Sequence, residues 1–221
     1  MNRKLIVIEG LDGSGKATQA ALLAKALEQT GRPVMQVTFP DYDSDSSALV
    51  KMYLAGKFGS HPDDVNAYAA SAFYSVDRYA SFKMNWAEFY QTGGLVIADR
   101  YTTSNAVHQC SKLKPEHWNE YLDWLFDFEY NKIAIPAPDR VIYLKVDPEV
   151  SQKLMTGRYK GDENKKDIHE KDLEYLSRSQ AAATYCAENL GWITVDCCRD
   201  KQMRSIEEIQ NDVLKAAKEV L

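Results

Sequence analysis

Residues 10–16, with the sequence GLDGSGK, decide the fold of this chain. They carry the spacing G-x-x-x-x-G-K and directly follow the short apolar run of residues 5–8 (LIVI) and Glu9. Glycines at this spacing let successive backbone N–H groups turn inward around an anion. A helix that begins near Lys16 adds the positive end of its dipole. A buried strand, a glycine-rich turn and a helix in this order predict a phosphate-binding loop.

Strand-like and helix-like segments alternate along the rest of the 221 residues. Their order predicts an α/β fold of the P-loop NTPase type, with a five-stranded parallel sheet, helices on both faces and a short lid. We find no repeat or linker that would divide the chain, so we expect a single P-loop domain over residues 1–221. The expected strands are residues 5–8, 34–39, 95–98, 141–144 and 192–195, and the clearest helical segments are residues 20–27, 62–90 and from about Ser205 onward.

The composition excludes several classes of protein. Hydrophobic residues make up 45% and charged residues 27% of the chain, as in ordinary globular proteins, and the net charge is −5. A negative chain is a poor ligand for polymeric nucleic acid, because neutralising phosphates needs a basic face. The first apolar run is too short for a signal peptide or a membrane span. The four cysteines lack metal-ligand spacing, which indicates free thiols in a reducing cytosol. We therefore expect a cytoplasmic protein that acts on small molecules, without a membrane partner.

The phosphate-binding loop predicts where ATP would bind. Lys16 is placed to reach the β- and γ-phosphates. Ala17 stands where a Ser or Thr hydroxyl usually binds Mg²⁺, and helical spacing points Thr18 elsewhere. The metal would then be held by ATP oxygens, water and a carboxylate such as Asp99; the alternative is a degenerate loop in a nucleotide-binding regulator. The candidate ATP-binding residues are Gly10, Leu11, Asp12, Gly13, Ser14, Gly15, Lys16, Ala17 and Thr18.

Asp99, Arg100 and Tyr101 follow the third expected strand. Ligands of open parallel sheets bind beyond the carboxyl ends of the strands, so these side chains should face the nucleotide. Asp99 would orient hydrated Mg²⁺, and the planar fork of Arg100 would clamp an acceptor phosphate. The alternative is an Asp–Arg ion pair on the surface, which contributes little to stability.

From residue 8 to residue 196 the chain resembles the thymidylate kinases of the P-loop nucleoside monophosphate kinase group. The resemblance rests on residues 10–19, 39–42 (FPDY), 74–78, 99–105 (DRYTTSN), 167–172 and 175–176. It implies a kinase that uses ATP and Mg²⁺ to convert dTMP to dTDP, on the route to dTTP. It also implies a homodimer formed by helix packing.

The resemblance also implies roles for residues that bind the acceptor. Tyr74 matches an aromatic that stacks on thymine, and Arg78 matches an arginine that hydrogen-bonds the base carbonyl; their i, i+4 spacing places both on one helix face. A core aromatic and a surface arginine are the alternative for this pair. The remaining candidates are Asp12 near the deoxyribose 3′-hydroxyl, Phe39 as a wall of the base pocket, Tyr42 toward the acceptor phosphate, Arg100 as its clamp, Ser104 and Asn105 as polar contacts to the base, and His108.

His108 departs from the family pattern, in which a tyrosine or phenylalanine more often crowds the ribose 2′ position. Imidazole is smaller and can form hydrogen bonds. Selectivity for deoxyribose over ribose, and for dTMP over dUMP or other monophosphates, is therefore left open.

A nucleoside acceptor and a monophosphate acceptor differ in whether the site must supply a general base. A nucleoside hydroxyl needs a general base, and Asp41 lies near the end of the second expected strand, so a deoxynucleoside kinase is an alternative. A monophosphate needs none, because its second pKa is about 6. The sequences FPDY and DRY favour the monophosphate.

Residues 157–166 (GRYKGDENKK) are polar and contain two glycines, which is typical of a mobile loop. We expect a lid at about residues 157–170. Because residues 11–14 hold no arginine, the resemblance implies that the lid supplies one. We predict Arg158 as a catalytic residue beside Lys16 and Arg100, with Lys160, Lys165 and Lys166 as further lid cations; a solvated charge run is the alternative.

Overall fold

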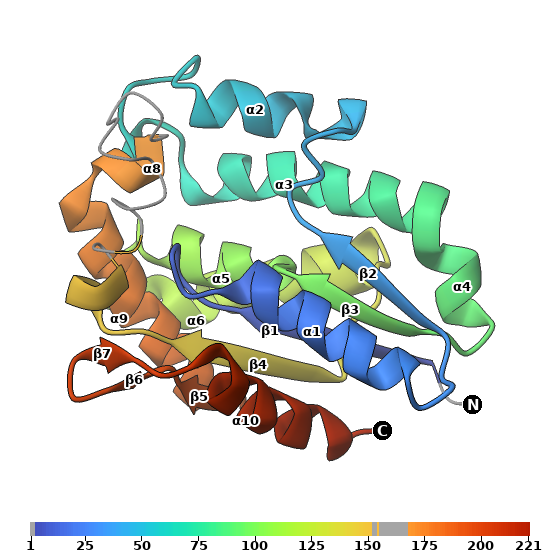
Figure 1. Ribbon diagram of the computed structural model, residues 1–221. Helices are drawn as coiled ribbons and strands as arrows, with labels where there is room; N and C mark the ends of the chain where they lie inside the picture. The colour runs from blue at the N-terminus through green and yellow to red at the C-terminus, as the bar shows by residue number, and fades with distance from the viewer. Residues whose placement is uncertain (1–2, 152–153, 155–167) are drawn as a thin grey trace.

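The sheet of the computed structural model is built as the apolar runs predict (Figure 1). The structure describes residues 3–151, 154 and 168–221. Five parallel strands pair in the order β2-β3-β1-β4-β5, and each predicted strand lies within one residue of an observed one. The strands are β1 (Lys4–Glu9), β2 (Val34–Thr38), β3 (Leu95–Asp99), β4 (Arg140–Lys145) and β5 (Ile193–Asp196).

Side chains of the central strands alternate between two apolar cores, one on each face of the sheet. Leu5 and Val7 of β1 pack into one core, whereas Ile6 and Ile8 pack into the other. All four are fully buried, which explains why the run is continuously apolar. In Figure 1, α1 (Lys16–Glu28) and α10 (Ile206–Lys218) cover the front face, and α5 (Thr102–Cys110) and α6 (Trp118–Phe126) lie behind it.

The predicted helical stretch of residues 62–90 is helical but not one helix. It consists of a 3₁₀ turn (Pro62–Asp64), α3 (Ala67–Ser81), a π-helical turn (Phe82–Trp86) and α4 (Ala87–Gln91). A second π-helical turn (Asp127–Lys132) follows α6. The other elements are α2 (Ala48–Leu54), α8 (Ile168–Lys171), α9 (Leu173–Asn189), and the hairpin of β6 (Cys198–Arg199) and β7 (Gln202–Met203).

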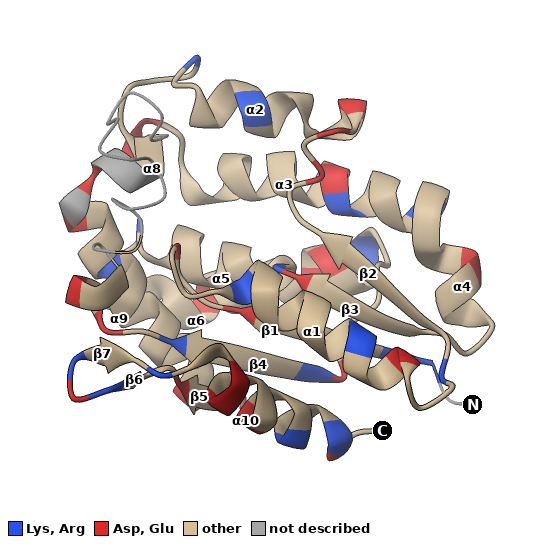
Figure 2. Ribbon diagram, in the orientation of Figure 1, with Lys and Arg blue, Asp and Glu red and all other residues tan. Residues whose placement is uncertain are grey.

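The last helix starts where the sequence places it. Ser205 is the N-cap of α10 and forms a capping box with Glu208. Acidic residues occupy the first turn of α10 and lysines its last turn, as Figure 2 shows, which complements the helix dipole. None of the described helices is long and apolar enough to cross a membrane.

Candidate active site

A cavity of about 910 Å³ lies beyond the carboxyl ends of β1, β2 and β3. It extends from the phosphate-binding loop to α3 and α5 on one side, and to β7 and α10 on the other. Sequence-predicted residues that line it are Asp12, Gly13, Ser14, Gly15, Lys16, Ala17, Thr18, Phe39, Tyr42, Tyr74, Arg78, Asp99, Arg100, Ser104, Asn105 and His108.

The loop after β1 has the backbone that its glycines predict. A Cβ at Gly10 would lie 2.9 Å from the carbonyl oxygen of Leu144, so no larger residue fits there. Gly15 has φ +84° and begins α1. Lys16 donates from Nζ to the carbonyl oxygen of Leu11 at 2.9 Å. Burial and the charge of Arg100 lower the pKa of Lys16 to about 8, although Asp12 and Asp99 oppose the shift. The lysine is therefore held by the loop itself.

Arg100 joins this loop to the far side of the cavity. Its guanidinium pairs with Asp12, lies 3.3 Å from Ser104 Oγ and 3.8 Å from Glu9 Oε1. Burial would raise the pKa of Asp12, but Arg100 and Lys16 hold it well below its usual range. The backbone of Arg100 has φ +65°, a left-handed conformation that is uncommon outside glycine. Asp99 and Arg100 both line the cavity, and the acidic partner of Arg100 is Asp12, so the alternative of an Asp99–Arg100 ion pair on the surface is wrong.

Glu9 is a site residue that sequence reasoning missed. Its side chain is 1% exposed and accepts hydrogen bonds from the backbone N–H of Gly10 (2.9 Å) and the hydroxyls of Thr103 (2.6 Å) and Ser104 (2.8 Å). It therefore ties the start of the phosphate-binding loop to the start of α5. The signal available was a carboxylate at the end of an otherwise apolar strand.

Asp99 has the properties of a metal ligand. Its Oδ1 is buried and has no hydrogen-bond partner among the described residues, and the same holds for Ser14 Oγ in the loop. Burial raises the pKa of Asp99, and Lys16 and Arg100 act in the opposite direction. An unpaired buried carboxylate oxygen is costly unless a cation or another donor meets it. No group of three or more His, Cys, Asp or Glu side chains among the described residues could hold a metal ion by itself. The unpartnered Asp99 Oδ1 suits a hydrated cation such as Mg²⁺, which proteins bind through one or two carboxylates together with phosphate and water oxygens.

Arg78 lies on the α3 side of the cavity, with 1% of its surface exposed. Its Nε donates to Glu129 Oε2 at 2.7 Å, and its Nη2 pairs with Glu129 Oε1. Burial opposes the charge of Arg78, but Glu129 raises its pKa overall. The alternative of a surface arginine is therefore wrong. Glu129, in the π-helical turn after α6, was not anticipated, since nothing near it in the sequence indicates a site.

Tyr74 and Arg78 share one face of α3, as their spacing predicts, and both line the cavity. Phe39 is 4% exposed and packs against Tyr101, with ring centroids 5.8 Å apart. Asn105 donates from Nδ2 to the carbonyl oxygen of Ser71 at 3.3 Å and to Glu129 at 3.4 Å. The side of the cavity formed by α3 and α5 thus combines aromatic walls with oriented polar groups, which suits a flat, partly polar ligand.

His108 belongs to a stacked aromatic cluster. Its ring lies 5.9 Å from that of His169, and its Nδ1 lies 3.3 Å from the hydroxyl of Tyr175. His169, inside the predicted lid of about residues 157–170, contacts the hydroxyl of Tyr53 at 2.9 Å and also lines the cavity. Burial and the charge of Arg100 lower the pKa of His108 to about 3, and burial also lowers that of His169. Both rings are therefore neutral at pH 7.

Comparison with known proteins identifies the chain. The sequence profile of the thymidylate kinase family matches residues 8–213. The chain belongs to this family.

Relatives and solved structures agree with this assignment. A thymidylate kinase of Mycobacterium tuberculosis is 30% identical over 196 residues, which cover 86% of this chain and 90% of that protein. A probable thymidylate kinase of Staphylothermus marinus is 30% identical over 210 residues, 94% of each chain. The solved thymidylate kinase of Candida albicans has the same fold, with a TM-score of 0.70 at 21% identity over 99% of this chain and 92% of that one.

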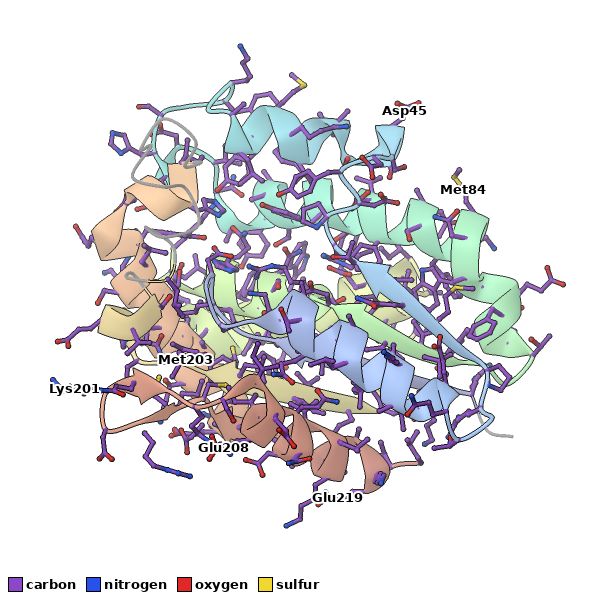
Figure 3. All side chains as sticks on the ribbon, viewed as in Figure 1. Asp45, Met84, Lys201, Met203, Glu208 and Glu219 are labelled. Carbon is purple, nitrogen blue, oxygen red and sulfur yellow. The ribbon has the colours of Figure 1, made fainter. Side chains whose placement is uncertain are left out.

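The far end of the cavity was not predicted. Met203, Arg204, Ile206 and Gln19 line it, and Gln19 Nε2 donates to the carbonyl oxygen of Ile206 at 3.1 Å. In Figure 3, Lys201 marks the tip of the β6–β7 hairpin and Met203 lies closer to the body of the molecule. A thymidylate kinase needs a second nucleotide site, and this end extends from the phosphate-binding loop on the side away from Arg78.

Some predicted residues of this thymidylate kinase family member lie outside the cavity or outside the described residues. Gly10 and Leu11 do not line the cavity. Gly10 lies against Leu144, and Leu11 packs against the apolar core, so both contact the protein interior and not the cavity. Tyr42 lines it but is 52% exposed. Arg158, Lys160, Lys165 and Lys166 lie outside the described residues.

Proposed function

We propose that this chain transfers the γ-phosphoryl group of ATP to dTMP, forming dTDP and ADP. The observation that carries the proposal is the Arg100–Asp12 ion pair, which joins the phosphate-binding loop to the end of β3. Both residues line the same cavity as Tyr74, Arg78 and Asn105. Membership of the thymidylate kinase family, whose phosphate donor is ATP, also supports this proposal. Donor and acceptor phosphates would meet at this pair.

The chemistry requires positioning more than acid–base catalysis. The acceptor phosphate is an anion at neutral pH, so the site must hold two polyanions in line and screen their repulsion. We assign Lys16 to the β- and γ-phosphates and Arg100 to the acceptor phosphate, for which its planar fork is suited. Asp12 neutralises Arg100 in the cavity and lies where a sugar hydroxyl could replace part of that contact.

We assign Mg²⁺ to Asp99, on the evidence of its buried, unpartnered Oδ1. Bound Mg²⁺ would supply charge neutralisation at the β- and γ-phosphates. Ala17 supplies no ligand, so phosphate and water oxygens complete the coordination shell.

The base would lie between Phe39 and Tyr74, with Arg78 and Asn105 at its polar edge and Ser104 nearby. Tyr42 reaches the acceptor phosphate, and His108 faces the sugar. The remaining phosphate-loop candidates, from Gly10 to Thr18, enclose the donor phosphates through backbone N–H groups.

The proposal includes four further features that rest on the sequence alone. They are a single domain over residues 1–221, a lid at about 157–170, Arg158 as the lid's catalytic cation, and a cytoplasmic location. A homodimer is supported by exposed apolar side chains on α3 and the π-helical turn after it, namely Tyr68, Val76, Tyr79 and Met84. Met84 is 77% exposed and points away from the body in Figure 3. Sedimentation equilibrium would show a stable dimer if this face is an interface.

Release of ADP across a panel of acceptors tests the function. The panel contains dTMP, dUMP, dCMP, UMP, other common monophosphates and thymidine, with a reaction lacking any acceptor. We expect ADP to form with dTMP and at most slowly without an acceptor. Turnover with thymidine but not dTMP would instead indicate a nucleoside kinase. ATP binding without turnover on any acceptor would indicate a regulator with a degenerate loop.

A further inference from the structure

Glu129 is a buried carboxylate whose position the phosphoryl transfer itself does not explain. It lies in the π-helical turn (Asp127–Lys132) behind the cavity, and its exposed fraction is 0%. It does not line the cavity, yet it contacts residues that do. A buried carboxylate needs partners on both oxygens to offset its lost hydration.

Both oxygens of Glu129 are fully engaged by residues of α3 and α5. Oε2 accepts from Arg78 Nε and from the hydroxyl of Thr102, each at 2.7 Å. Oε1 pairs with Arg78 Nη2, lies 2.8 Å from Ser75 Oγ, and accepts from Asn105 Nδ2 at 3.4 Å. One carboxylate therefore joins the two helices that carry the acceptor-side polar groups.

These contacts fix what Arg78 presents to the cavity. Glu129 occupies the edge of the guanidinium formed by Nε and Nη2. Nη1 makes one long contact, 3.5 Å to the carbonyl oxygen of Tyr101. The second N–H of Nη2 makes a long contact, 3.5 Å, to Ser75 Oγ. Because a guanidinium is planar and has only donors, the remaining N–H of Nη1 is the group that can meet a ligand, and that ligand must offer an acceptor there.

The same carboxylate orients Asn105. Its Nδ2 faces two acceptors, Glu129 and the carbonyl oxygen of Ser71, so the amide nitrogen is on that side. Since the amide is planar, Oδ1 is directed away from Glu129. Arg78 then offers a donor and Asn105 an acceptor to the cavity.

We propose that Glu129 is a positioning residue that sets the base selectivity of the acceptor site. By orienting Arg78 and Asn105 it selects a base edge with a carbonyl oxygen beside an N–H, as in thymine and uracil. Cytosine presents an amino group beside a bare ring nitrogen and so mismatches both. This inference rests on the proposed function, because it assumes that the acceptor base lies against Arg78.

Buried ion pairs are often no more stabilising than apolar residues of the same volume, so stability alone does not account for this network. A purely structural carboxylate and a positioning one make different predictions. Loss of a structural contact would lower turnover with every substrate in proportion. Loss of a positioning contact would change one substrate's KM and the ratio between bases.

The test is steady-state kinetics of Glu129→Gln with dTMP and dCMP as acceptors. The amide carries one acceptor and one donor group where Arg78 presents two donors, so one contact becomes repulsive. We expect the KM for dTMP to rise about 30-fold or more, as when one partner of a buried charge pair is lost. We expect the KM for ATP to change less than about twofold. The ratio of kcat/KM for dTMP over dCMP should fall about tenfold or more.

Asp127→Asn is the matched control. Asp127 lies in the same π-helical turn but is exposed and pairs with Lys132, so it should change none of these values. Glu129→Asp keeps the charge on a shorter side chain and should restore part of the dTMP/dCMP ratio. If Glu129→Gln does not fold, Thr102→Val, which removes one hydrogen bond to Glu129, should lower the same ratio by a smaller factor.

An unchanged dTMP/dCMP ratio in the soluble variants, with equal losses for both acceptors and ATP, would overturn the inference. Calorimetric binding of dTMP separates this from a failure of the proposed function. A wild-type chain that binds dTMP in preference to dCMP but never forms ADP would refute the kinase and leave the role of Glu129 intact.

Discussion

The two ends of the cavity are held together in different ways. At the donor end, Lys16 bonds to Leu11, five residues away, and the glycines set the backbone by themselves. At the acceptor end, Arg78 bonds to Glu129, 51 residues away, across two elements. The backbone of the donor-end loop is therefore set by consecutive residues, although Arg100 and Glu9 join the loop to the segment after β3 and to α5. The acceptor end, in contrast, exists only once α3, α5 and the π-helical turn have packed. Substitutions at the donor end should mainly lower turnover, whereas substitutions at the acceptor end should lower both dTMP binding and the stability of the fold.

The largest effect is expected at the donor end. Lys16→Ala removes the cation at the β- and γ-phosphates and should lower kcat about 10³-fold, because this charge meets the charge that develops in the transition state. Single-turnover ADP release measures it. Because the loop backbone is local, the free energy of unfolding should change little. Lys25→Ala, on the exposed side of α1, is the control; a kcat near wild type in Lys16→Ala would mean that ATP binds elsewhere.

The acceptor end should lose both binding and stability. Arg78→Ala should raise the KM for dTMP by a factor that corresponds to a loss of about 1.5–3 kcal/mol of binding free energy, the range for a charged hydrogen bond. The KM for ATP should stay unchanged. The substitution should also destabilise the fold by about 3–5 kcal/mol, because Glu129 is left buried without its partner. Steady-state kinetics measure the change in KM, and urea unfolding measures the change in the free energy of unfolding. Lys83→Ala, exposed just after α3, controls for loss of charge; equal effects on both substrates would place Arg78 outside the acceptor site.

The acceptor end should also determine the response to acid. The pKa of His108 is about 3 in the fold and about 6.5 in an unfolded chain, so between these values the unfolded state binds more protons. Stability therefore falls as the pH drops through 6.5, by about 2 kcal/mol between pH 7 and pH 5 from His108 alone. The groups around it are Arg100, Asp12, Lys16, Lys112, His169 and Tyr175. His169 acts in the same direction.

Urea unfolding at pH 7 and pH 5 measures this loss. His108→Gln should reduce the difference between the two pH values, whereas His117→Gln, at an exposed position, should not. An unchanged pH dependence in His108→Gln would show that the ring is hydrated and free to take a proton.

The smallest effect is expected at Ala17. Ala17→Ser adds a hydroxyl at an exposed position, where substitutions change free energies by no more than about 0.5 kcal/mol, so turnover should stay within about twofold. The Mg²⁺ concentration needed for half-maximal turnover should fall or stay the same. Loss of turnover at saturating Mg²⁺ would contradict a coordination shell completed by water and phosphate.

The same contrast explains how much could be predicted from the sequence. The five strands, the loop and the start of α10 depend on local patterns, and they were predicted within one residue or so. Family resemblance added Tyr74, Arg78 and Asn105, which do line the cavity. Glu9 and Glu129 were missed, because a lone glutamate becomes informative only when distant hydroxyls and a guanidinium converge on it. Most of the surface of α5 is buried, so its sequence has no separate polar face to mark a helix. In α6 the buried residues Trp118, Tyr121, Leu122 and Leu125 do follow helical spacing, and this signal was available in the sequence.

The left-handed backbone of Arg100 is a conformation that suits glycine, and it costs a non-glycine residue about 1–2 kcal/mol. Glycine at position 100 would relieve this strain but would remove the guanidinium that joins Asp12 to Ser104 and Glu9. Losing one partner of a buried charge pair costs about 3–5 kcal/mol, which is more than the strain. A laboratory selection for heat tolerance would therefore be expected to keep the arginine, and with it the group that can bind a phosphate.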